Sequence, residues 1–139
     1  MSFKESLIIG KVKRVITNKI RASSLFDSST QAIETAKTIP LNARTSKSIL
    51  RELYEGLREY CEAIGYLNGY KFLDHESITY FLKEILQENT LSIKFDRYRK
   101  LRNGINYYGE SINIETVKES LIEIPKIIEG LKKHSKRVS

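Results

Sequence analysis

The amino-acid sequence predicts an all-α fold, an up-and-down helical bundle of about four to five main helices. Apolar residues recur in several segments at the three- and four-residue spacing of one helix face, and no segment alternates as a strand does. The chain has 139 residues, 40% of them hydrophobic and 29% charged, which suits one globular domain. We expect a single domain over residues 1–139, with a basic N-terminal arm at about 1–16 and a basic C-terminal tail at about 132–139.

The first predicted helix lies between Lys19 and Pro40, where the proline closes it. Small side chains recur along this segment, and they would let a second helix approach closely. These small residues are Ala22, Ser28, Ser29, Ala32 and Ala36.

The clearest helix is predicted from Thr45 to Asn68 because its apolar residues follow one helical face. The lone cysteine, Cys61, belongs to that face and is expected to lie in the core. The opposite face is charged, and we expect it to be solvated. The apolar face holds Ile49, Leu50, Leu53, Leu57, Tyr60, Cys61, Ile64 and Leu67, and the charged face holds Arg51, Glu55, Arg58, Glu59 and Glu62.

Two further helices are placed by their capping residues. Gly69 ends the preceding helix and Asp74 caps the next, while Asn113 caps the last helix. Pro125 removes a backbone donor, so we expect the last helix to kink or restart near Glu123. The predicted buried faces are Ile78, Phe81, Leu82 and Ile85 in one helix and Val117, Leu121 and Ile124 in the other.

The helix predicted from Phe95 to Tyr108, ending at Gly109, carries an apolar and a polar stripe side by side. Because Arg102 borders the apolar stripe, its stem can be covered while its guanidinium points into a groove, a setting that suits phosphate. The apolar stripe is Tyr98, Leu101, Ile105 and Tyr108 with Phe95 at its edge, and the polar stripe is Arg99, Arg102, Asn103 and Asn106 with Asp96 and Tyr107 at its margin.

Spacing alone leaves two interpretations of the polar stripe open, an ordinary solvated helix face or a phosphate-binding site. Asparagine is a poor helix former that gains nothing on a free surface. Asn103 and Asn106, with Gly104 between them, therefore favour a functional use of this stripe.

The stretch RNGINYYG, from Arg102 to Gly109, resembles the HEPN domains (higher eukaryotes and prokaryotes nucleotide-binding), a family of all-α bundles. Looser similarity in RASSLFDSSTQAIETA, SILRELYEGLREYCEAIGYLNGYKFLDHES and ITYFLKEIL extends the resemblance over roughly Arg21 to Gly109. The family's signature is an Arg, commonly followed by a polar residue, with a His shortly beyond. Arg102 and Asn103 match this signature, whereas Tyr107 stands where the His is expected.

The resemblance implies that two protomers form a homodimer whose motifs meet in a cleft that binds RNA or a nucleotide. Active members cut RNA without a metal, the Arg stabilising phosphate and the His moving protons. The phenol of Tyr107 has an ordinary pKa of ~10, so it is a poor general base unless Arg99 and Arg102 lower that pKa. It can still donate a hydrogen bond or stack on a base. We expect binding, with any metal-independent ribonuclease activity impaired or altered.

The candidate site is therefore confined to one helix. Catalytic roles are assigned to Arg102, Asn103 and Tyr107, and phosphate or RNA contacts to Arg99, Arg102, Asn106 and Tyr108. No cofactor is expected, and no metal site, because the chain has two histidines and one cysteine. His75 is expected to be structural or solvent-facing, and His134 belongs to a mobile basic tail.

The net charge of +7 favours polyanionic partners. An alternative is a protein-interaction module, since the resemblance also implies pairing with a small nucleotidyltransferase as toxin and antitoxin. A DNA-binding protein is the weakest interpretation, because the chain lacks the short turn and basic recognition helix of a helix-turn-helix. No apolar run is long enough to span a bilayer, so we expect a cytoplasmic protein without membrane contact.

Overall fold

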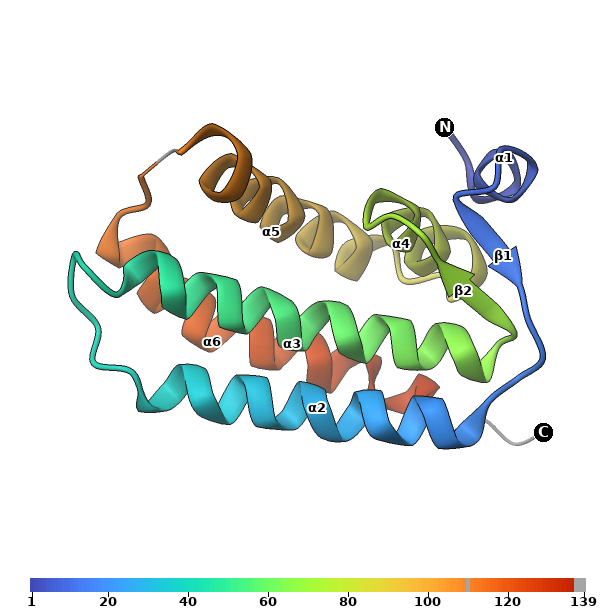
Figure 1. The fold of residues 1–139 in the computed structure, drawn as a ribbon, viewed down its shortest axis with the longest axis horizontal. Helices are drawn as coiled ribbons and strands as arrows, with labels where there is room; N and C mark the ends of the chain where they lie inside the picture. The colour runs from blue at the N-terminus through green and yellow to red at the C-terminus, as the bar shows by residue number, and fades with distance from the viewer. Residues whose placement is uncertain (110, 137–139) are drawn as a thin grey trace.

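The computed structural model describes residues 1–109 and 111–136, apart from the side chains of residues 106–108. It confirms the predicted all-α bundle, because most of the chain is helical (Figure 1). In chain order the elements are α1 (Phe3–Ile8), β1 (Val12–Arg14), α2 (Lys19–Thr38), α3 (Ser46–Leu67), β2 (Tyr70–Phe72), α4 (Glu76–Tyr80), the π-helix η1 (Phe81–Ile85), α5 (Asn89–Tyr108), α6 (Ile114–Leu131) and the 3-10 helix η2 (Lys132–His134).

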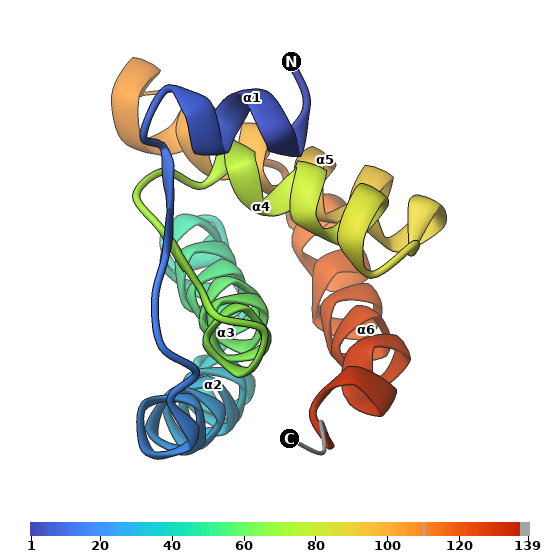
Figure 2. The ribbon, with the colours of Figure 1, turned by 90° about the vertical axis from the view of Figure 1, so that its right-hand side faces the viewer.

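The long helices surround one shared core. α2 and α3 run antiparallel and side by side, joined by residues 39–45. Viewed end-on, α2 and α3 lie on one side and α6 on the other, with α4 and α5 covering the top (Figure 2). α3 is the central helix, since it packs against α2, α5, α6 and β2.

The sequence places α3 correctly but underestimates how far its burial extends. Thr45 and Asn68 flank the helix as predicted, and Cys61 is fully buried. Tyr54, which lies outside the predicted apolar face, is also fully buried. Neighbouring helices therefore cover more of α3 than a single stripe. The predicted face members Ile49, Leu50, Leu53, Leu57, Ile64 and Leu67 are all buried, and Tyr60 is half-buried.

Small residues let α2 approach α3 closely, as the sequence predicts. A Cβ atom added at Gly56 would lie 2.8 Å from Ile33 Cδ1 and 3.1 Å from the backbone oxygen of Ser29. The Ser29 hydroxyl donates a hydrogen bond to the Gly56 carbonyl at 2.6 Å. The two backbones are thus held together at the middle of the hairpin.

The prediction that the charged face of α3 is solvated holds at the exposed Arg51 and is wrong at Glu59. Arg58 forms ion pairs with both Glu55 and Glu62. Glu59 is only 9% exposed and accepts a hydrogen bond of 2.6 Å from the Ser28 hydroxyl of α2. Burial raises the pKa of Glu59, although the bond from Ser28 opposes the shift. The prediction fails because α2 covers part of this face.

The segment after β2 begins as predicted and then departs from a regular α-helix. Asp74 caps α4, its carboxylate accepting a hydrogen bond of 3.0 Å from the Ser77 N–H. The chain continues as η1, where the Leu86 N–H donates to the Phe81 carbonyl at 3.1 Å. A π-helical turn changes the angle between successive side chains, so Ile85 is 40% exposed and its predicted burial is wrong. The other predicted members, Ile78, Phe81 and Leu82, are buried.

The structure also contains two short strands that the sequence pattern does not predict. β1 and β2 pair antiparallel, with Val12 opposite Phe72. Each strand has three residues, too few for alternation to show in the sequence. The short helix α1 precedes β1 in the chain. Its first residue, Phe3, is buried, and the Phe3 N–H donates a hydrogen bond to the Glu84 carboxylate at 3.1 Å. The segment expected as a basic arm, residues 1–16, is therefore anchored to the bundle.

α5 is longer than predicted, because it begins at Asn89 rather than near Phe95. It ends as predicted at Gly109, whose φ of 65° is the left-handed conformation that glycine adopts readily. Of its apolar stripe, Phe95, Tyr98 and Ile105 are buried and Leu101 is half-buried, while the Tyr108 side chain lies outside the described residues.

α6 is capped as predicted, with the Asn113 side chain accepting a hydrogen bond of 2.8 Å from the Thr116 N–H. Of the kink or restart predicted near Glu123, the restart is wrong, since α6 continues through Pro125 as one helix. Burial of its apolar face outweighs the loss of one backbone donor. That buried face includes Val117, Ile124, Ile127 and Leu131, whereas the predicted member Leu121 is half-buried.

The start of the basic tail packs against the bundle. His134 Nε2 lies 2.7 Å from Glu88 Oε2, and Lys133 Nζ lies 3.1 Å from the same oxygen. Glu88 is the residue that immediately precedes α5. None of the helices in the described part of the chain is long and apolar enough to cross a membrane.

We predict that Gly56→Ala destabilises the fold by about 1–2 kcal/mol, although alanine is the better helix former. The new methyl group would press against the Ile33 side chain and the backbone oxygen of Ser29, and a backbone atom cannot turn away as a flexible side chain can. Denaturant unfolding measures the loss. Gly130→Ala in α6 is the matched control, because its methyl group meets only the side chain of Leu91, at 3.1 Å, and should leave stability nearly unchanged. Equal stability of the two variants would contradict this account of the α2–α3 contact.

Candidate functional site

The start of α4 and the middle of α5 enclose an open hollow of about 500 Å³, which we call the arginine groove. Three of the predicted site residues, Arg99, Arg102 and Asn103, lie along one wall. The opposite wall comes from the chain between β2 and α4. The complete lining is Leu73, Asp74, His75, Glu76, Arg99, Arg102 and Asn103.

Arg99 is held firmly by two carboxylates. Its Nε donates to Asp96 Oδ1 at 2.8 Å, its Nη2 lies 3.8 Å from Glu76 Oε2, and its side chain is only 12% exposed. Burial acts to raise the pKa of Asp96, but hydrogen bonds from Arg99 and Lys100 hold it below its usual value. Arg99 therefore has less freedom to bind a ligand than the sequence suggests, and it stiffens the wall of the groove.

Arg102 lies in a different environment. Its guanidinium carbon stands 5.7 Å from the centroid of the Tyr54 ring, a cation–π arrangement. No carboxylate of the described residues lies within ion-pair distance of this guanidinium. The side chain is half-buried. Arg102 is thus a partly desolvated cation whose charge no neighbouring acid balances.

His75 is the second polar group that Tyr54 holds in the groove. The Tyr54 hydroxyl lies 3.1 Å from His75 Nδ1, and the two rings are 5.7 Å apart. Tyr54 is fully buried, and a buried hydroxyl donor needs an acceptor. Because Nδ1 is the acceptor within reach among the described groups, we assign the ring proton to Nε2. His75 then offers an N–H donor at Nε2.

The electrostatic environment keeps His75 neutral at pH 7. Burial lowers its pKa most, and the positive charges of Arg58 and Arg102 lower it further, to about 4. Burial likewise raises the pKa of Tyr54, so that its hydroxyl keeps its proton. The groove therefore combines the guanidinium of Arg102, which has no ion-pair partner among the described residues, with neutral donors.

The acidic residues of the lining have cationic partners. Asp74 pairs with Lys11 at 3.5 Å and also caps α4, while Glu76 lies near Arg99. Among the charged residues of the described lining, Arg102 alone has no oppositely charged partner within ion-pair distance.

The sequence did not assign His75 a functional place, and it describes the rest of the site in part. Arg99, Arg102 and Asn103 come together as predicted, with Asn103 half-buried in the wall. Asn106, Tyr107 and Tyr108 belong to the helical backbone of α5, but their side chains lie outside the described residues. Their assigned roles therefore stay predictions.

His75 carried no signal that would have linked it to Arg102. The two residues come together because each contacts Tyr54 of α3. A single tyrosine in an amphipathic helix has no sequence pattern that would indicate these contacts. The other histidine, His134, pairs with Glu88 at 2.7 Å. Over residues 1–109 and 111–136, no group of three His, Cys, Asp or Glu side chains is arranged to hold a metal ion.

Comparison with known proteins gives no relative for this chain. No model of a protein family, no curated protein and no solved structure matches it. The resemblance to HEPN domains thus stays a prediction from the sequence.

We predict that His75 makes the fold less stable in acid. Above pH 6.5 the ring is neutral in both the folded and the unfolded chain. As the pH falls toward 4, the unfolded chain takes up a proton that the folded chain does not, because the folded pKa is about 4. After allowance for solvent screening, the loss is about 1–2 kcal/mol.

Denaturant unfolding at pH 7 and at pH 4.5 measures this loss for the protein and for His75→Gln. The glutamine variant should lose less stability between the two values, because it cannot take up the proton. The comparison cancels the acidic groups that titrate in both proteins. An identical loss in both would show that His75 is not responsible.

Proposed function

We propose that the arginine groove binds a phosphate group of RNA or of a nucleotide. The observation that carries this proposal is the unbalanced charge of Arg102, half-buried and stacked on Tyr54 without a carboxylate partner in the described residues. A partly desolvated cation is costly unless an anion meets it. A bound anion would relieve this cost, so the groove is prepared for one.

The donors around Arg102 favour phosphate over a single carboxylate. Guanidinium binds phosphate oxygens in a bidentate fashion. The His75 Nε2–H and the Asn103 amide offer additional neutral donors in the same groove. A tetrahedral anion with several oxygens uses donors from two walls, whereas a planar carboxylate is satisfied by the guanidinium alone.

The choice of RNA or a nucleotide is supported by the rest of the chain. The net charge of +7 favours polyanions. The stretch RNGINYYG resembles HEPN domains, and we propose membership of that family with the homodimer it implies. Cleavage is proposed to be impaired or altered, because Tyr107 stands at the place of the family's histidine. Binding is therefore the function that we put first.

We predict that Arg102→Ala weakens binding of single-stranded RNA at least tenfold, at fixed salt, with little change in melting temperature. The variant removes the groove's unbalanced cation but only a cation–π contact from the fold. Arg102→Lys keeps the charge and loses the bidentate geometry, so it should bind with intermediate affinity. Fluorescence anisotropy of a labelled RNA measures all three proteins.

Arg44→Ala is the control for net charge, because it removes one exposed arginine from the turn between α2 and α3. It should bind RNA nearly as well as the unchanged protein. Equal affinity of Arg102→Ala and Arg44→Ala would contradict the proposal. The same RNAs incubated in EDTA test cleavage, and cutting that Arg102→Ala abolishes would make the protein a metal-independent ribonuclease.

A further inference from the structure

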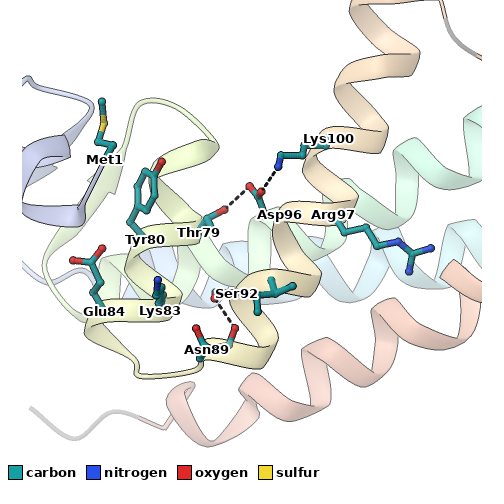
Figure 3. Close-up of a pocket in the computed structure, with 11 residues that line it drawn as sticks. Met1, Thr79, Tyr80, Lys83, Glu84, Asn89, Ser92, Asp96, Arg97 and Lys100 are labelled. Carbon is teal, nitrogen blue, oxygen red and sulfur yellow. Dashed lines mark hydrogen bonds and ion pairs between the residues drawn. The ribbon is translucent and has the colours of Figure 1, made fainter.

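A second hollow of about 550 Å³ opens on the other side of the Asp96–Arg99 ion pair. Its walls come from the N-terminus, α4, η1 and α5 (Figure 3). We call it the second pocket. The arginine groove and the second pocket meet at one ridge, because Arg99 lines the groove, Asp96 lines the second pocket, and the two side chains are 2.8 Å apart.

The second pocket combines three kinds of side chain that a nucleotide can use. Tyr80 provides an aromatic ring near Met1 (Figure 3). Ile93, which also lines the pocket and is 64% exposed, adds an apolar surface. Thr79 and Asn89 provide neutral polar groups, and Lys83 provides an ammonium group. Flat apolar area, neutral hydrogen-bonding groups and a cation are what a base and its phosphate require.

The cations of the second pocket differ in availability. Arg97 points away toward α6, where it pairs with Glu119 at 2.8 Å (Figure 3). Lys100 is bound to Asp96 at 3.1 Å. Lys83 is exposed and has no carboxylate within ion-pair distance in the part of the chain that the structure describes. Lys83 is therefore the cation most ready to meet a phosphate here.

The backbone supports the shape of this pocket. η1 places Lys83 and Glu84 in the pocket wall, and Glu84 anchors α1 through the Phe3 N–H at 3.1 Å. That anchor also brings Met1 to the rim. π-helical turns are often found at functional sites. Here the turn places Lys83 and Glu84 in the wall of a hollow next to the arginine groove.

From this adjacency we infer that the second pocket is a subsite for the neighbouring nucleotide of an RNA strand whose phosphate is bound by Arg102. The inference depends on the proposed function and specifies its ligand: single-stranded RNA of two or more nucleotides rather than a mononucleotide. Tyr80 stacks on the base, and Lys83 meets the next phosphate. The ridge of Asp96 and Arg99 separates the two positions.

The test is a length series of ligands measured by titration calorimetry: uridine 5′-monophosphate, a diuridine and a tetrauridine with 5′-phosphates. We expect the diuridine to bind at least fivefold more tightly than the mononucleotide, because it adds one stacked base and one further phosphate contact. Tyr80→Ala should remove this gain and leave mononucleotide binding unchanged. Lys83→Ala should weaken the longer ligands about fivefold, and Lys37→Ala on α2 serves as the charge control.

Lys83 is exposed, so its variant tests the subsite even if Tyr80→Ala folds poorly. Equal affinity along the ligand series, or equal weakening of mononucleotide and longer ligands by Lys83→Ala, would overturn the subsite. In that case Arg102-dependent binding of the mononucleotide would still support the proposed function. Failure of every ligand to bind would overturn the proposed function and the subsite together.

Discussion

The rest of the structure depends on the burial of α3 on almost every side. Where neighbouring elements cover this helix, its polar groups cannot reach water, so each of these covered groups needs a partner on a neighbouring element. The Glu59 carboxylate accepts a hydrogen bond from the Ser28 hydroxyl, and the Gly56 carbonyl accepts one from the Ser29 hydroxyl. These bonds fix how α2 lies on α3, and the same requirement shapes the opposite side of the helix.

On the opposite side of α3, the need of a buried polar group for a partner shapes the arginine groove. The hydroxyl of Tyr54 is buried and bonded to His75, while the face of its ring carries the guanidinium of Arg102. One core residue thus sets the positions of two groove residues that come from different elements. The groove is preorganised because its donors are held by the core rather than by flexible loops. This arrangement also explains why the ring of His75 remains neutral beside two arginines.

The sequence predicts the parts of the fold that depend on local pattern and fails where neighbouring elements decide. Helix caps such as Asp74 and Asn113 are visible because capping is chemistry within one turn. The short strands are not, because three residues carry no period and their pairing joins distant segments. The arginine stripe of α5 follows from helical geometry, but its union with His75 depends on the packing of Tyr54. The π-helical turn that exposes Ile85 likewise has no signature in the residues themselves.

The pairing of β1 with β2 has a consequence for the order in which the chain assembles. Along the chain, β1 precedes α2 and β2 follows α3, so their pairing closes a long loop that contains the α2–α3 hairpin. Closing such a loop in an unfolded chain costs entropy, whereas a formed hairpin already brings its two ends close. Helices form faster than distant strands pair. His75 lies three residues beyond β2, so we expect its contact with Tyr54 to form together with the strand pairing, after the hairpin. On this expectation, the binding groove is completed later than the core that α2 and α3 share.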